Sequence, residues 1–240
     1  MGRAAWPRRR GEEVTVNQNQ HPPRSRHFQL EQLADSVYAA IHVHGGWGFG
    51  NSGIIDLGQP HAGVRQLPYA AGRGRAAGRR RGGHPLHVRP PNVTFEGRMT
   101  LQGSQRAAEL IEYQGGHSPS DAVLALLTEG ILFAGDLLFI AAHPYLEAGD
   151  THQVLRIMER IAEVHPQTLV PSHGPVGSSA DLERFSGYIG TLDRLAQESV
   201  AAGEPEEAAS ETAIPEPYAS WEVPSFFAQN LRLFHRRHAG

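Results

Sequence analysis

"GGHSPSDAVLALLTEGILFAGDLLF", residues 115–139, carries the clearest structural pattern of this chain. It places His117 in a glycine-flanked loop, followed by two short apolar runs that a Thr-Glu-Gly turn separates. Short apolar runs joined by a tight, glycine-containing turn are typical of a β-hairpin. The second run leads directly to Asp136, where a hydrophobic strand is expected to give way to a polar residue. The stretch therefore predicts a sheet that carries a histidine and a carboxylate on its loops.

Strands and turns continue on both sides of this hairpin. Upstream, the pattern predicts two strands in 28–43 around a turn at 34–36, a short strand in 52–58, and a hairpin over 92–113. Downstream, apolar residues at helical spacing predict a helix over 151–164, capped by Asp150 or Thr151, and "QTLVPSH" predicts a strand that ends on His173. Further helices are expected over about 179–202 and from near Ser225. The pattern predicts a sheet-rich domain with helices packed on its outside.

Composition changes mark the boundaries between segments. We expect a disordered leader over 1–27, a main domain over 28–202, a linker over 203–220 rich in Pro and Glu, and a C-terminal helix within 221–240 that packs on the domain. Inside the main domain, residues 59–89 form an irregular Arg/Gly-rich tract. Its first 27 residues, 59–85, contain six Arg, six Gly and no acidic residue.

Charge and composition exclude several classes of protein. The formal net charge of −3 over 240 residues indicates neither a nucleic acid nor a membrane as partner. No cysteine is present, so disulfides, thiolate metal sites and thiol nucleophiles are all excluded. The basic N-terminus is followed by no apolar run of signal-peptide type, and no stretch is long and apolar enough to span a membrane. We therefore expect a cytoplasmic protein whose metal ligands, if any, are His, Asp and Glu.

Three residues are candidates for such a site. Asp136 and His173 each follow an apolar strand, and His117 lies in a loop between strands. Two imidazoles and a carboxylate suit a borderline metal such as zinc, and loops at strand ends can hold them without loss of core packing. A loop histidine can equally be structural or exposed, and a Gly-Asp pair after a strand can be only a turn.

Three segments of the chain carry a family resemblance, in this order: "NSGIIDLG", "GGHSPSDAVLALLTEGILFAGDLLF" and "LVPSHGPVG". With them, the chain resembles the metallo-β-lactamase-fold hydrolases, a superfamily that includes glyoxalase II-like thioester hydrolases. The resemblance covers residues 28–58 and about 90–190. It implies an α/β fold, a four-layer α/β/β/α sandwich, here incomplete in its N-terminal half, with C-terminal helices. It also implies a metal centre in which His117 ligates one zinc, His173 ligates a second, and Asp136 bridges the two. Asp121 is expected to support the loop.

The chain departs from the family at the main ligand motif. The family's His-x-His-x-Asp-His string, which supplies four further ligands, is absent from this sequence. His84 and His87 lie near the place where it belongs, but their spacing is not the family pattern. His42 and His44, which alternate on a predicted strand, are expected to be surface or packing residues. We therefore expect one zinc ion at most, where intact relatives hold two.

Three explanations for residues 59–89 remain open at this stage. An out-of-frame stretch or internal deletion in a GC-rich gene would give this mixture, since all 22 basic residues of the chain are arginine. A genuine basic insertion could bind an RNA backbone through its arginines. A natural, metal-poor family member could serve as a scaffold or binding module.

The resemblance implies a metal-dependent hydrolase in which a hydroxide held by the metal attacks an ester, thioester or amide carbonyl. We expect an impaired metal site, a small-molecule substrate, and no membrane or nucleic-acid partner. The alternatives are a truncated or frameshifted family member without enzymatic activity and, as a weaker option, an RNA-binding protein.

Overall fold

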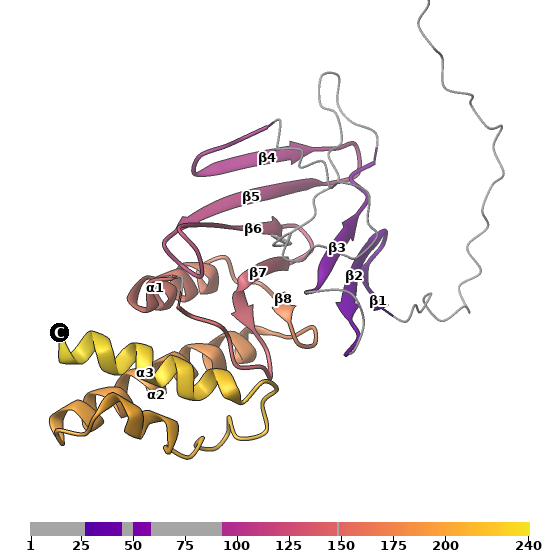
Figure 1. Ribbon diagram of the computed structural model, residues 1–240. Coiled ribbons are helices and arrows are strands. Elements are labelled where there is room, and N and C mark those ends of the chain that lie inside the picture. Colours follow the sequence, from indigo (N-terminus) through magenta and orange to yellow (C-terminus); the bar gives the residue numbers. More distant parts are fainter. Residues whose placement is uncertain (1–26, 45–49, 59–92, 148) are drawn as a thin grey trace, which may run out of the picture.

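A computed structural model describes residues 27–44, 50–58, 93–147 and 149–240 (Figure 1). The expected leader and the Arg/Gly-rich tract, with His84 and His87, lie outside these residues except for His27. The elements, in chain order, are β1 (Phe28–Ala34), β2 (Val37–His42), β3 (Ser52–Ile55), β4 (Arg98–Gln102), β5 (Ala107–Gln114), β6 (Ser120–Leu126), β7 (Ile131–Phe139), α1 (Thr151–Ala162), β8 (Thr168–His173), α2 (Ser179–Ala201), the 3₁₀ helix η1 (Glu206–Ser210) and α3 (Ser225–Ala239).

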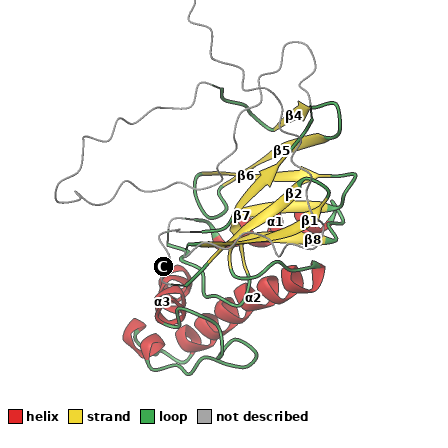
Figure 2. Ribbon diagram, turned by 90° about the vertical axis from the view of Figure 1, so that its right-hand side faces the viewer, coloured by secondary structure: helices red, strands yellow, loops and turns green. Residues whose placement is uncertain are grey.

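The strands form two sheets. β1, β2 and β3 form a three-stranded antiparallel sheet, and β4 to β8 form a five-stranded sheet in sequence order. Neighbours in the larger sheet are antiparallel except β7 and β8, which are parallel and are connected through α1. A parallel pair needs such a crossover, because the chain must return to the same end of the sheet. Figure 2 shows the strands above α2 and α3.

Alternation along β6 and β7 shows how the layers are built. Leu124 and Leu126 point to a core shared with β2 of the small sheet, whereas Val123 and Ala125 point to the helices. Successive strand residues face opposite sides of a sheet, so a strand buried on both faces is apolar throughout. This explains why the decisive hairpin is a nearly continuous hydrophobic run.

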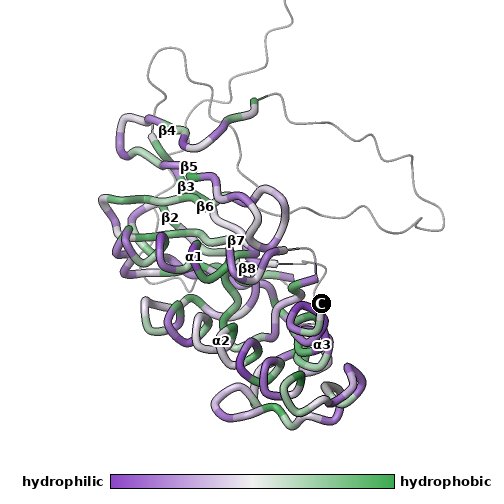
Figure 3. The backbone as a smooth tube through the Cα atoms, turned by 90° about the vertical axis from the view of Figure 1, so that its left-hand side faces the viewer, coloured by the Kyte–Doolittle hydropathy of each residue, from purple (hydrophilic) through white to green (hydrophobic). Residues whose placement is uncertain are grey.

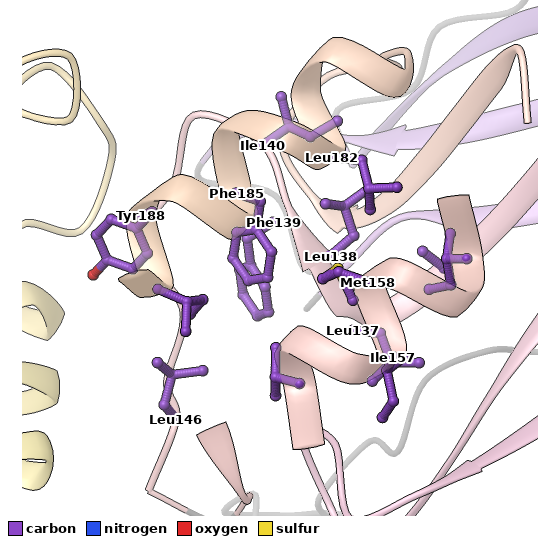
Figure 4. Packing of buried hydrophobic residues seen from close by; sticks show 14 of the residues in the cluster. Leu137, Leu138, Phe139, Ile140, Leu146, Ile157, Met158, Leu182, Phe185 and Tyr188 are labelled. Carbon is purple, nitrogen blue, oxygen red and sulfur yellow. The ribbon is translucent and has the colours of Figure 1, made fainter. Parts of the chain in front are cut away.

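The larger core lies between the five-stranded sheet and the helices. Phe139 at the end of β7 stacks on Phe185 of α2, with ring centroids 6.3 Å apart (Figure 4). Helix α1 begins where the Asp150 carboxylate accepts hydrogen bonds from the backbone of His152 and Gln153, as the capping prediction required. Figure 3 shows hydrophobic stretches along the strands. In α2 and α3, hydrophobic and hydrophilic stretches alternate.

The predicted hairpins and helices are present in the described residues, with two differences. Asp136 lies within β7 rather than after it, at an irregularity in the pairing with β8. Residues 203–220, predicted as a linker, contain η1, and Tyr218 is buried in the core. Of the layers in the expected sandwich, the described residues supply the two sheets and the helices that cover the larger sheet. Within those same residues, no helix is long and apolar enough to cross a membrane.

Candidate metal centre

A cavity of about 720 Å³ contains the three predicted ligands in its wall. His117, Asp136 and His173 come from the loop before β6, from β7 and from the end of β8. The Nε2 atom of His173 lies 3.9 Å from Oδ1 of Asp136, and both side chains are partly exposed. The structure thus brings the three residues to one cavity, while metal binding by them stays a prediction.

The chain bends directly before Asp136, at an irregularity within β7. Gly135 has a φ of 57°, a backbone conformation that residues with a Cβ rarely adopt. The register between β7 and β8 shifts on both sides of Gly135. Leu137 on the far side is fully packed in the helix-facing core. The bend therefore exposes one carboxylate in the middle of an otherwise buried strand.

His173 is held by stacking and by its backbone. Its ring lies over Phe139, with centroids 4.9 Å apart and an interplanar angle of 14°. Its carbonyl accepts a hydrogen bond of 3.0 Å from the backbone N–H of Ile140. The next residue, Gly174, has a φ of 100°, and a Cβ there would lie 1.8 Å from the carbonyl oxygen of Ile140. The turn after β8 thus requires glycine next to the imidazole.

His117 lies in a loop that the neighbouring carboxylate supports. Asp121 accepts hydrogen bonds from the backbone N–H and the hydroxyl of Ser118, at 3.0 and 2.8 Å, which confirms its predicted supporting role. The His117 ring lies 6.0 Å from the Phe139 ring, so Phe139 contacts both imidazoles of the candidate site. In the described part of the chain, the buried Nδ1 atom of His117 has no hydrogen-bond partner.

Electrostatics favour a neutral imidazole at His173. Burial lowers the pKa of His173, because it penalises the charged form. The Asp136 carboxylate acts in the opposite direction but does not outweigh burial. A neutral imidazole has a free lone pair, which is the form that binds metals.

Two further histidines in the cavity wall were not expected there. His42 and His44, predicted as surface or packing residues, both line the cavity. His42 also contributes to lowering the pKa of His173. Asn51 joins the two regions, since its Oδ1 accepts a hydrogen bond from the N–H of His42 and its Nδ2 donates to the carbonyls of Pro171 and Gly174. His42 ends β2 and His44 follows it by two residues, but the sequence gives no sign that Asn51 links this region to the end of β8.

The donor set fits a metal ion only in part. Asp136 and His173 form a close pair, and the unpartnered Nδ1 of His117 is an atom that a third metal bond would satisfy. Among the described residues, however, no group of three or more His, Asp or Glu side chains lies close enough to hold an ion as it stands. The residues present therefore fit an incomplete centre.

This chain is similar to several solved structures. A metallo-beta-lactamase from Pontibacter korlensis is 25% identical, with a TM-score of 0.39, and the match covers 42% of this chain and 49% of that chain. A stereoselective inverting sec-alkylsulfatase from Pseudomonas sp. is 17% identical, with a TM-score of 0.50, over 63% of this chain and 27% of that chain. A metallo-beta-lactamase family protein from Thermus thermophilus is 16% identical, with a TM-score of 0.48, over 62% and 49%.

The chain thus spans about half of the length of the Pontibacter and Thermus proteins and about a quarter of the length of the sulfatase. No curated protein matches it. The family model of the metallo-beta-lactamase superfamily matches residues 42–173, more than half of the 240 residues, and this range includes His117, Asp136 and His173. The chain belongs to the metallo-beta-lactamase superfamily.

Proposed function

We propose that this protein is a metal-dependent hydrolase with an impaired centre, in which Asp136, His173 and His117 hold a single zinc ion weakly. The observation that supports the proposal most is the approach of His173 Nε2 to Asp136 Oδ1, at 3.9 Å, in the wall of a cavity that also contains His117. Membership of the superfamily supports the reaction class.

The chemistry divides between the ion and the chain. When bound, a zinc ion lowers the pKa of a water molecule and polarises a carbonyl, which are the two requirements for ester, thioester or amide hydrolysis. The chain would hold His173 neutral by burial and fix its ring on Phe139. Asp136 would supply the negative charge that keeps a cation in the cavity. Both side chains are partly exposed, so water can reach the pair.

The impairment follows from the spacing of the donors and from the absence of the family's His-x-His-x-Asp-His string. Catalytic zinc sites usually have three protein ligands with one position open for water. The centre proposed here has only that minimum, and two of its members come from a 3.9 Å pair that must tighten around the ion. We therefore expect slow turnover.

A hydrolysis assay tests the reaction class. Purified protein with added zinc should cleave a nitrophenyl ester or an aryl thioester slowly, and Asp136→Asn should lose the zinc-dependent part of the rate because it removes the carboxylate. Asp35→Asn changes an exposed carboxylate in the turn between β1 and β2, and serves as the matched control. Zinc-dependent turnover that is equal in both variants would contradict the proposal.

The second candidate is a family member without enzymatic activity that acts as a binding module. The absence of a ready three-donor group in the described residues favours it. It predicts that the assay gives no zinc-dependent rate for any variant, although the cavity still binds a ligand.

A further inference from the structure

Away from the candidate metal centre, the wall of the cavity is largely aromatic and aliphatic. Tyr145, from the loop after β7, lines the cavity together with Glu222, Val223 and Phe226, which precede or begin α3. The Tyr145 and Phe226 rings contact each other, with centroids 5.7 Å apart. The C-terminal segment thus adds an aromatic and aliphatic wall to the same cavity.

Part of this wall is exposed hydrophobic surface. Tyr145 is 38% exposed and Val223 is 45% exposed, among the few large hydrophobic side chains of the described residues that are so accessible. Single exposed hydrophobic residues are ordinary, but apolar side chains that meet in a concave site with a few polar groups are typical of a ligand pocket.

Hydrogen bonds hold the aromatic wall in place. The Tyr145 hydroxyl donates to Oε2 of Glu147 at 2.8 Å, and the side chain of Gln229 in α3 donates to the same oxygen at 3.1 Å. Arg236, two turns further along α3, lies 3.7 Å from the other carboxylate oxygen of Glu147. A side chain that is already ordered loses little entropy when a ligand binds, so this wall is preorganised for binding.

The backbone beneath the wall is strained. Ala141 and Val223 have φ values of 55° and 58°, and a β-branched residue is a genuine outlier in this region. Glu222, directly before Val223, is hydrogen-bonded to the segment around Ala141. Its N–H donates to the carbonyl of Ala141, and its carbonyl accepts from the N–H of His143. Such strain of about 1–3 kcal/mol persists at sites where the conformation serves binding. The two hydrogen bonds of Glu222 hold the backbone directly before Val223, which lines the cavity.

The fixed charges of the wall are negative. Asp136 and Glu222 are carboxylates, and the described residues that line the cavity include no arginine. Glu222 lies within electrostatic range of the candidate centre, since its carboxylate opposes the lowering of the His173 pKa that burial causes. An anionic ligand would meet repulsion here, whereas a neutral or cationic one would not.

We propose that Tyr145, Val223 and Phe226 form an apolar subsite beside the candidate metal centre, and that Glu222 makes this subsite select hydrophobic groups that are uncharged or positively charged. This inference rests on the proposed function in identifying the cavity as a substrate site. The substrate class that follows is a neutral or cationic ester, thioester or amide with an aryl or branched alkyl group.

Three probes of one shape and different charge test the subsite. Naphthylmethylammonium, naphthylmethanol and naphthoate are titrated calorimetrically into the full-length, metal-free protein at neutral pH and low ionic strength. The ammonium should bind about two- to five-fold more tightly than the carboxylate, the range expected for a partly exposed charge pair, with the alcohol between them. Glu222→Gln should reduce that difference to the part that Asp136 causes, and the matched control Glu183→Gln, which changes an exposed carboxylate on α2, should keep all of it.

The apolar contacts are tested separately. Phe226→Ala should weaken all three probes by about five-fold or more, because each buries the same ring. Leu127→Ala removes a side chain that is 50% exposed and does not line the cavity, so it should change none of them. Circular dichroism checks that each variant folds. If Phe226→Ala does not fold, Phe226→Leu replaces it. This variant should weaken the binding of all three probes by a smaller factor that is similar for each.

Four results would each overturn the inference: equal binding of the ammonium and the carboxylate, a charge preference that Glu222→Gln leaves undiminished, no effect at Phe226, or no binding of any probe. The titrations need neither metal nor turnover. Probe selectivity without hydrolysis would therefore refute the proposed function alone, and zinc-dependent hydrolysis without probe selectivity would refute the subsite alone.

Discussion

Asn51 holds the turn at Gly174 through a hydrogen bond of 2.8 Å from its Nδ2 atom to the glycine carbonyl. The same amide donates to Pro171 and accepts from the N–H of His42, so one buried side chain ties the end of β8 to the end of β2. His173 lies between Pro171 and Gly174 in the chain. The position of the imidazole in the cavity therefore depends on the amide of the residue that directly precedes β3.

Asn51→Ala should destabilise the fold by about 2 kcal/mol or more, because it leaves buried backbone groups without partners. Urea unfolding followed by circular dichroism measures the change. The control is Gln32→Ala, which removes an exposed amide bonded to the carbonyl of Ala34, and should cost less than about 0.5 kcal/mol. A similar loss in both variants would show that the Asn51 amide has no special structural role.

Gly174→Ala should lower the free energy of unfolding by more than the left-handed backbone conformation alone would cause. Gly203 also has a positive φ, 70°, but a Cβ there would meet no atom within 4 Å. Gly203→Ala should therefore cost only about 1–2 kcal/mol for the left-handed conformation, whereas Gly174→Ala adds the clash with Ile140 and should cost clearly more. Thermal unfolding of the pair measures the difference. Equal losses would mean that the turn after β8 can move away from Ile140.

Much of the fold could be predicted because its signals are local. The hairpin of β6 and β7 is encoded by neighbouring apolar runs and a glycine turn, and the helical spacing in α1 is equally local. The family resemblance and the predicted strand ends together implied that His117, Asp136 and His173 lie near one another, and they do line one cavity, although Asp136 lies within β7 rather than after it.

The missed features depend on contacts between distant segments. No local pattern indicates that His42 meets the end of β8 or that Phe226 packs on Tyr145. The bend at Gly135 also escaped prediction, because a Gly-Asp pair in sequence can mark either the end of a strand or an irregularity within it. In the structure, parallel pairing with β8 resumes after the bend and keeps Asp136 inside β7.

Val223→Gly should leave the protein at least as stable as it was. Glycine adopts positive φ without steric cost, which offsets the extra freedom it gives to the unfolded chain. Val93 is also 45% exposed but is not among the residues with positive φ, so Val93→Gly should be the less stable variant of the two. Denaturant unfolding compares them. Greater destabilisation by Val223→Gly would contradict the account of strain at the cavity wall.

Acid should destabilise the protein partly through His143. Burial lowers the pKa of this imidazole, and the backbone of Tyr218 acts in the opposite direction. Its stabilising effect is complete above the ordinary histidine pKa of about 6.5 and is lost as the pH falls through the lowered value in the folded state. Each such group contributes a slope of up to about 1.4 kcal/mol per pH unit in that window.

His143→Gln should therefore flatten the fall in unfolding free energy on the acid side of neutrality, and it keeps a polar group beside the Tyr188 hydroxyl, 3.0 Å from Nδ1 in the wild type. Unfolding midpoints across a pH series give the slope. The exposed His152 on α1 provides the control, and His152→Gln should keep the wild-type slope. An unchanged slope in His143→Gln would assign the acid sensitivity to other groups.

Equilibrium dialysis with metal analysis measures zinc binding to the purified, metal-free protein and so tests whether Asp136, His173 and His117 form a metal centre. We expect about one weakly bound equivalent, with affinity reduced at least about 10-fold in Asp136→Asn, His173→Ala and His117→Ala but not in His152→Ala. Two tightly bound zinc ions, or one equivalent that survives all three substitutions, would show that these residues do not form the metal centre.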